Sequence, residues 1–312
     1  MSWFWIIIIF IILLIIIIVI IIGYIYASIF FPGLLLSKSN IKYVHDVKEL
    51  DHFIKECKVL DLNEVDDIIY KIDDLRRDKI FIKRNSVMDT IGIPSYLDLP
   101  FDNYHKIKYY NDILSNNFSF LYPKLISNLE KMLGKKCIYP TNEEASIIST
   151  SSSISSSNND EEYKNENNKD NHLYSLPGFH IFGGKTWLGA GWSVASLHID
   201  KQFNRVEFPS NMKFDYEKTI SFTLAISVPD NSGLYIYDEK ENTKELRTKY
   251  KNTYHYLKNK TRYKVNYEIG HMYVHDGVHY HMISEFNSID DRITLQGHGI
   301  YCETTDSYWL YW

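Results

Sequence analysis

A hydrophobic run at the amino terminus contains no charged residue between Trp3 and Phe31. The stretch Ile6–Ile22 is almost entirely Ile, Leu, Val and Phe, so every face of a helix formed there would be apolar. A bilayer core needs roughly 20 such residues, and in lipid a helix satisfies its own backbone polar groups. Aromatic residues, which favour the membrane interface, lie at both ends of the run: Trp3, Trp5, Tyr24 and Tyr26. We therefore predict a single transmembrane helix within an anchor that spans residues 1–36.

A cleaved signal peptide is the alternative interpretation of this run. Its apolar core would be shorter, about 7–15 residues, and a basic segment would precede it. Neither feature is present, so the anchor is expected to be retained. Lys38, Lys42 and Lys48 follow the run, whereas no Lys or Arg precedes it. The positive-inside rule then predicts that the carboxy-terminal part lies in the cytoplasm.

The charge balance of the whole chain excludes some partners. The 34 Lys and Arg residues are outnumbered by 39 Asp and Glu residues, which gives a formal net charge of −5. A dedicated nucleic-acid-binding protein would show a basic excess, so no nucleic-acid partner is expected. Only three cysteines are present, without the C-x-x-C spacing of zinc sites. The glycine-rich phosphate-binding motifs and the G-x-S-x-G motif of serine hydrolases are also missing.

The remainder, residues 41–312, is interpreted as one domain with three parts. In residues 41–140, apolar residues recur at helical spacing over Val65–Leu75 and Phe120–Leu133, and Gly134 offers a helix stop. Residues 141–172 are dominated by Ser, Asn, Asp, Glu and Lys, and cannot bury enough apolar surface to offset the entropy lost on ordering. We predict a disordered insertion there, followed by a β core over 173–312.

Several short runs after Leu176 are rich in β-branched and aromatic residues and are separated by Gly, Asn, Asp and Pro. This pattern is typical of a β-sandwich or barrel, so the fold class is predicted to be mostly β with supporting amino-terminal helices. The expected strands cover residues 179–182, 194–199, 220–228, 233–237, 263–267, 272–275, 281–286 and 292–301.

A His-x-Asp motif occurs once, at His198-Ile199-Asp200. Residues i and i+2 of a strand share a face, so this imidazole and this carboxylate would both point into the barrel. Together with a second histidine they would form the 2-His-1-carboxylate triad that suits non-haem Fe(II) and leaves positions open. One such motif is expected about once by chance in a chain of this composition, so the downstream residues decide the interpretation.

A second inward-facing set is predicted on the strand that begins at Arg292. By parity Arg292, Thr294, Gln296 and His298 share one face. A guanidinium that points into a barrel needs an anionic partner, because an unpaired buried charge is costly. A dicarboxylic acid bound bidentately would satisfy Arg292, with the Thr294 hydroxyl as a further donor. The alternative is a surface Arg292 paired with Asp290 or Asp291.

In order, His198-x-Asp200, Gly277-x-x-x-His281 and Arg292-x-Thr294 resemble the 2-oxoglutarate- and Fe(II)-dependent oxygenase superfamily. The likeness to an oxygenase-like family of undefined substrate is closer, and extends over Leu176–Phe182, Ser196–Gln202, Ile220–Ala225 and the terminal Tyr311-Trp312. The resemblance implies a double-stranded β-helix, or jelly roll. It also implies Fe(II) bound by His198, Asp200 and His281, and 2-oxoglutarate bound through its distal carboxylate by Arg292 and Thr294.

The activity implied is oxidative decarboxylation of 2-oxoglutarate coupled to hydroxylation of a C–H bond by O₂, on an unknown substrate. Two alternatives stay open: a jelly roll that binds metal without turnover, and a cupin-type metal-dependent hydrolase or isomerase without 2-oxoglutarate. His275 competes with His281 as the distal ligand, and His279 is two residues away. His180 and His298 are candidates for contacts in the pocket.

Overall fold

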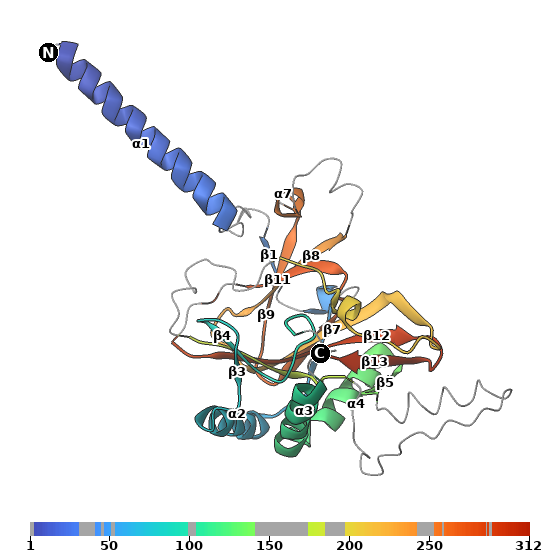
Figure 1. Cartoon of the computed structure of the whole chain (residues 1–312). Coiled ribbons are helices and arrows are strands. Elements are labelled where there is room, and N and C mark those ends of the chain that lie inside the picture. The colour runs from blue at the N-terminus through green and yellow to red at the C-terminus, as the bar shows by residue number, and fades with distance from the viewer. Residues whose placement is uncertain are drawn as a thin grey trace, which may run out of the picture.

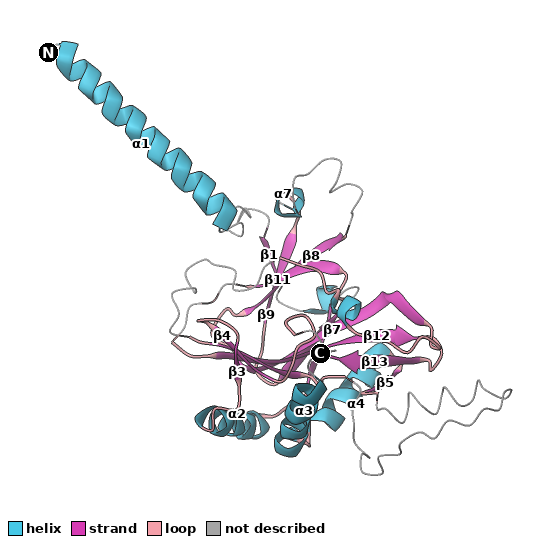
Figure 2. Cartoon of the chain, viewed as in Figure 1, coloured by secondary structure: helices cyan, strands magenta, loops and turns pink. Residues whose placement is uncertain are grey.

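The computed structural model describes most of the chain, with gaps of ten or more residues at 31–40, 141–173, 185–196 and 242–252. The described residues are 3–30, 41–44, 47–50, 54–98, 104–140, 174–184, 197–241, 253–257, 259–284, 286 and 289–312 (Figure 2). The Ser- and Asn-rich segment predicted to be a disordered insertion, 141–172, lies outside them.

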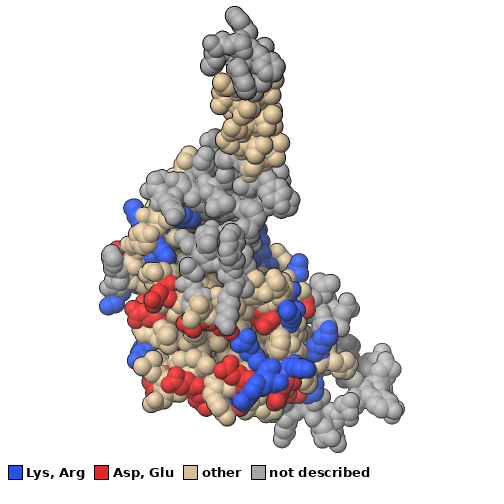
Figure 3. Space-filling model, turned by 90° about the vertical axis from the view of Figure 1, so that its left-hand side faces the viewer, with Lys and Arg blue, Asp and Glu red and all other residues tan. Residues whose placement is uncertain are grey.

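Helix α1 (Trp3–Phe30) projects away from the remaining elements, as Figure 1 shows. Its side chains are described from Ile9 to Gly23, and the large apolar ones from Ile9 to Ile22 are 46% to 69% exposed. Figure 3 shows no charged side chain on this part of the helix. Among the described residues, no helix is both long and apolar enough to cross a membrane.

The strands that the structure describes beyond α1 form two β-sheets. The smaller sheet has the strand order β1-β9-β8-β11, and the larger has the order β2-β10-β7-β12-β6-β4-β3, with β13 beside β12 and β5 beside β13. The strands of the smaller sheet are β1 (Ile41–Tyr43), β8 (Gly233–Lys240), β9 (Arg262–Asn266) and β11 (His279–Ile283). Those of the larger are β2 (Ile54–Lys58), β3 (Ile82–Lys83), β4 (Met88–Ile91), β5 (Lys136–Ile138), β6 (Gly178–Phe182), β7 (Phe214–Ser227), β10 (His271–His275), β12 (Arg292–Cys302) and β13 (Ser307–Tyr311).

The chain alternates between these sheets from β6 onward. It passes from β6 in the larger sheet to a single bridge at His198 beside β11, and then returns to the larger sheet at β7. It continues through β8 and β9 in the smaller sheet, β10 in the larger, β11 in the smaller and β12 in the larger. The described architecture is therefore mostly β, and its connectivity is consistent with a jelly roll.

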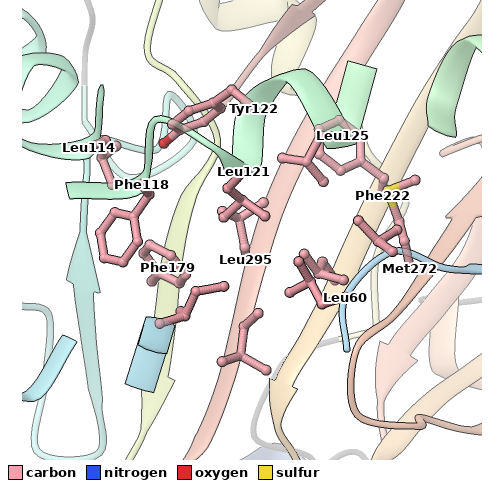
Figure 4. Packing of buried hydrophobic residues seen from close by; sticks show 14 of the residues in the cluster. Leu60, Leu114, Phe118, Leu121, Tyr122, Leu125, Phe179, Phe222, Met272 and Leu295 are labelled. Atoms are coloured by element: carbon pink, nitrogen blue, oxygen red, sulfur yellow. The ribbon is translucent and has the colours of Figure 1, made fainter. Parts of the chain in front are cut away.

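Three helices cover the outer face of the larger sheet (Figure 1): α2 (Leu62–Arg77), α3 (Tyr104–Phe118) and α4 (Leu121–Leu133). Figure 4 shows how Leu121 and Leu125 of α4 pack against the sheet residues Phe222 and Leu295. All four side chains are at most 1% exposed, so this layer buries the apolar face that each helix has from its 3.6-residue period. A smaller apolar cluster fills part of the space between the two sheets: Leu50, Ile54, Ala225, Leu234, Ile236, Val265, Tyr267 and Tyr273.

Both helices predicted from apolar spacing are confirmed, as α2 and α4. Asp61 and Glu64 form a reciprocal capping box at the start of α2, and α4 ends where Gly134 adopts a left-handed φ of 65°. Of the predicted strands, 194–199 differs most. Residues 194–196 lie outside the described part, and His198 makes only an isolated bridge. Short elements complete the fold: η3 (Val47–Leu50), η6 (Gln202–Arg205) and α7 (Thr253–Leu257).

Candidate metal centre

The two histidines predicted as ligands lie side by side because their backbones pair. His198 and His281 form an antiparallel bridge, with N–H···O distances of 3.0 and 2.9 Å. The Asp200 N–H donates to the Gly277 carbonyl at 2.7 Å, which connects the His-x-Asp segment to the turn before β11. This pairing explains the spacing Gly277-x-x-x-His281, since both the glycine and the histidine face the same short segment.

The side chains of His198, Asp200 and His281 converge, and one potential ligand atom from each lies within 4.8 Å of the other two. The His281 Nε2 atom is 3.2 Å from Asp200 Oδ2, and the His198 Nε2 atom is 3.5 Å from Asp200 Oδ1. Two atoms that each ligate one ion at roughly 2.1 Å can be at most about 4.2 Å apart. The spacing of this donor set therefore fits a transition-metal ion, and its chemistry is that of a 2-His-1-carboxylate triad.

Neighbouring groups fix the orientation of two of these donors. The His281 Nδ1–H donates to the His279 carbonyl at 2.9 Å, which orients the ring with Nε2 3.2 Å from Asp200 Oδ2. Asp200 accepts hydrogen bonds from Ser221 Oγ and, at 2.8 Å, from Gln202 Nε2. Burial raises the pKa of Asp200, but His281, His198 and the other nearby groups outweigh burial, and the pKa lies well below its ordinary value. Asp200 is thus a carboxylate at neutral pH.

Arg292 is completely buried, with 0% exposure. Its Nε–H donates to Ser232 Oγ at 2.9 Å, while Nη1 and Nη2 have no hydrogen-bond partner among the described residues. Burial lowers the pKa of Arg292 to about 10, so the guanidinium keeps its charge at neutral pH. The alternative of a surface Arg292 is wrong, and Asp291 instead pairs with Arg76 at 2.7 Å. The guanidinium lies 5.5 Å from the Tyr267 ring centroid and 5.7 Å from that of Phe182, but no described carboxylate pairs with it, so an anionic ligand would compensate its buried charge.

The triad and Arg292 line one cavity of about 500 Å³ between the two sheets. Its size is within the range of small-molecule sites. Gln296 and His298 of β12 also line it, as strand parity predicts. Thr294 is fully buried but is not a lining residue; its hydroxyl accepts a 3.4 Å hydrogen bond from Gln296.

His275 and His279, the alternatives to His281 as the distal ligand, do not belong to the converging group. His275 lines the cavity but is outside the converging group, and its Nδ1 accepts the Gly277 N–H at 3.2 Å. The register of β11 against β8 shifts between His279 and His281, and His279 bonds Asp276 at 2.8 Å rather than joining the converging group. Burial lowers the pKa of His275 to about 3 and also lowers that of His298. The geometry therefore brings together the predicted set His198, Asp200 and His281.

Several cavity residues were missed by the sequence analysis. Ser221 bridges the triad to β12, because its hydroxyl contacts Asp200 and lies 2.9 Å from His298 Nδ1. A signal for it exists, since Ser221 and Thr223 alternate with large apolar residues in β7. Tyr96, which lies far upstream of the β core, also lines the cavity, and its hydroxyl is 2.7 Å from His180 Nε2. No local pattern places Tyr96 there.

The sequence matches no family model, and no curated protein matches it. The described structure is similar to solved structures of low sequence identity. A non-haem α-ketoglutarate-dependent carbocyclase, SnoK from nogalamycin biosynthesis, is 11% identical with a TM-score of 0.42, over 86% of this chain and 84% of that chain. HygX from Streptomyces hygroscopicus, solved with nickel and 2-oxoglutarate bound, is 8% identical with a TM-score of 0.39, over 84% and 87%. An N-substituted L-amino acid dioxygenase from Burkholderia ambifaria is 15% identical with a TM-score of 0.32, and the match spans 44% of this chain and 54% of that one.

Proposed function

We propose that this protein is a membrane-anchored Fe(II)- and 2-oxoglutarate-dependent dioxygenase. In this proposal His198, Asp200 and His281 bind the iron, and Arg292 binds the distal carboxylate of 2-oxoglutarate. The chemistry of the donor set and its spacing of 3.2 and 3.5 Å support the metal assignment.

The buried guanidinium of Arg292 is the observation that carries the co-substrate assignment. It lines the same cavity as the triad, and two of its nitrogen atoms have no partner among the described residues. A dicarboxylate whose other end reaches the metal would place its distal carboxylate at these donors and make charge-assisted hydrogen bonds. A metal-binding protein without such a ligand has no use for a buried unpaired cation, whose cost is high.

The protein groups in the cavity would bind and orient rather than react. The Ser221 and Gln202 hydrogen bonds hold the Asp200 carboxylate, and the His279 carbonyl holds the His281 ring. Phe182, Phe222 and Ile283 contribute apolar surface to the cavity wall. When bound, iron would supply the redox chemistry that couples decarboxylation of 2-oxoglutarate to hydroxylation of a C–H bond by O₂.

The anchor and its orientation complete the proposal. The charge-free sequence from Trp3 to Phe31 supports a single membrane-spanning segment. Lys38, Lys42 and Lys48 support a cytoplasmic location of the cavity-bearing part.

An anaerobic visible spectrum tests the enzyme proposal. Full-length protein in a non-ionic detergent is titrated with Fe(II), and then with 2-oxoglutarate. A metal-to-ligand charge-transfer band that appears only when both are present would support the proposal. Iron binding without this band would instead favour the cupin-like alternative, and failure to bind iron would contradict both.

A further inference from the structure

The short helix η6 (Gln202–Arg205) follows the metal-site residue Asp200 directly and carries two polar side chains that line the cavity. Gln202 donates through Nε2 to Asp200 Oδ1 at 2.8 Å, whereas its Oε1 atom is buried without a partner among the described residues. Arg205 is solvent-exposed and donates through Nη1 to the Tyr96 carbonyl at 3.0 Å. The Arg205 guanidinium is thus an exposed part of the cavity lining, and among the described residues it bonds the Tyr96 carbonyl.

The charges of the described cavity residues do not balance. Lys201, Arg205 and Arg292 are cationic, whereas Asp200 is the only lining carboxylate among the described residues. Lys201 is compensated by an ion pair with Glu241. If the proposed function holds, the two charges of Fe(II) and that of Arg292 are offset by Asp200 and the two carboxylates of 2-oxoglutarate. Arg205 is then the uncompensated cation of the loaded cavity.

No described Asp or Glu lies within ion-pair distance of Arg205. A guanidinium offers five N–H donors in a planar fork that matches an oxyanion. Arg205 lines the same cavity as Gln202, which contacts the metal-site carboxylate, and its exposure leaves its donors open to a ligand that enters from solvent.

We propose that Arg205 is a substrate-binding residue and that the primary substrate carries an oxyanion, either a carboxylate or a phosphate monoester. The Arg205 guanidinium would bind the oxyanion at the cavity entrance and direct the rest of the substrate toward the triad. Gln202 Oε1 would accept a hydrogen bond from a donor group of the same molecule. This inference names the substrate class of the proposed enzyme and rests on that function, but the binding of an oxyanion to Arg205 does not itself require a metal.

Ligand-observed fluorine NMR provides the test, with three probes of one shape: 4-fluorophenylacetate, 4-fluorophenyl phosphate and the neutral 4-fluorophenylacetamide. Full-length protein in non-ionic detergent is loaded with Ni(II) and saturating 2-oxoglutarate, so that Arg292 is occupied. We expect at least one anionic probe to bind about tenfold more tightly than the amide, as charge-assisted hydrogen bonds predict. The preferred anion then distinguishes a carboxylate from a phosphate substrate.

Variants distinguish anion binding at Arg205 from a nonspecific effect of the protein's positive charges. Arg205→Gln should remove the anion preference, Arg205→Lys should restore part of it, and Arg77→Gln should leave it unchanged, because Arg77 is an exposed α2 residue outside the cavity. Thermal melts confirm that each variant is folded. Equal binding of the amide and both anions to the wild type, or an anion preference that survives in Arg205→Gln, would overturn the proposal.

Titrations in a second protein background, metal-free Arg292→Gln, distinguish failure of the Arg205 site from failure of the proposed dioxygenase function. If the protein does not bind Ni(II) and 2-oxoglutarate, Arg292 is open to the probes, so the titrations are repeated on metal-free Arg292→Gln. An anion preference that persists there and disappears in Arg205→Gln/Arg292→Gln supports the Arg205 site even if the dioxygenase proposal fails. Absence of any preference in metal-free Arg292→Gln contradicts the Arg205 site.

Discussion

At the scale of single residues, the candidate metal centre depends on three side chains, two of which are histidines among several others in or near the same cavity. We expect His198→Ala, Asp200→Ala and His281→Ala each to lose iron, because two protein ligands are left to hold the ion. His275→Ala should keep iron, since His275 lies outside the converging group. Iron content after anaerobic loading and desalting is the measurement. Loss of iron in His275→Ala with retention in His281→Ala would mean that the distal ligand is wrongly assigned.

The buried histidines also predict how stability depends on pH. Burial, with a contribution from Arg292, lowers the pKa of His180 to about 3. The unfolded chain binds this proton near pH 6.5, so the folded state loses stability as pH falls from about 6.5 toward 3. One such histidine contributes a slope of roughly 1.4 kcal/mol per pH unit in this window.

Replacement of His180 by Gln keeps an acceptor for the Tyr96 hydroxyl and removes the titration. We therefore expect His180→Gln to reduce the acid slope by up to about 1.4 kcal/mol per pH unit, as measured by urea unfolding of metal-free protein between about pH 4.5 and 6.5. A slope identical to that of the wild type would show that His180 is not held neutral by the fold.

At the residue scale, the sequence pattern can also be compared with the geometry. The spacing from Gly277 selects His281 over His275 and His279, and the backbone pairing of His198 with His281 is the physical cause of that spacing. Strand parity places Arg292 in the cavity, but Thr294 lies off its lining. Tyr96 and Ser221 act through contacts between distant segments, which a single sequence does not reveal.

At the scale of elements, two glycines with left-handed φ values offer a matched comparison. A Cβ at Gly277 (φ +71°) would lie 3.3 Å from the hydroxyl oxygens of Ser221 and Thr219 and 3.4 Å from Asp200 Cβ, whereas a Cβ at Gly134 (φ +65°) would meet nothing within 4 Å. Alanine at either position should cost about 1–2 kcal/mol of stability from backbone strain. Only Gly277→Ala should also weaken iron binding, because it crowds the metal site.

Chemical denaturation and iron content of the two variants check this expectation. Equal iron affinity in Gly277→Ala and Gly134→Ala would show that the turn before β11 does not shape the metal centre.

The elements themselves were predictable to different degrees. Helices α2 and α4 are marked by 3.6-residue periodicity and by capping residues, and most strands after Leu176 are marked by β-branched and aromatic runs. The short strands β1 to β5 and the terminal β13 were missed. Strands of two to five residues carry little pattern of their own, and their identity depends on partners far away in the sequence, as when β2 pairs with β10.

At the scale of the whole molecule, the proposed membrane anchor predicts how the protein behaves on fractionation of cells. We expect the full-length chain to remain in the membrane pellet after alkaline carbonate extraction, because the charge-free run is long enough to cross a bilayer. A chain without residues 1–36 is the matched control and should be found in the supernatant. Release of the full-length chain by carbonate, or a mature amino terminus after Tyr26, would contradict the anchor.

The central claim is that one cavity binds both iron and 2-oxoglutarate, and the Arg292→Ala variant tests it most directly. The charge-transfer band is titrated with 2-oxoglutarate in iron-loaded wild type and in Arg292→Ala. Loss of charge-assisted hydrogen bonds, each worth about 1.5–3 kcal/mol, should weaken 2-oxoglutarate binding by tenfold or more while the iron content stays unchanged. Unchanged 2-oxoglutarate affinity in Arg292→Ala with its iron intact would contradict the account.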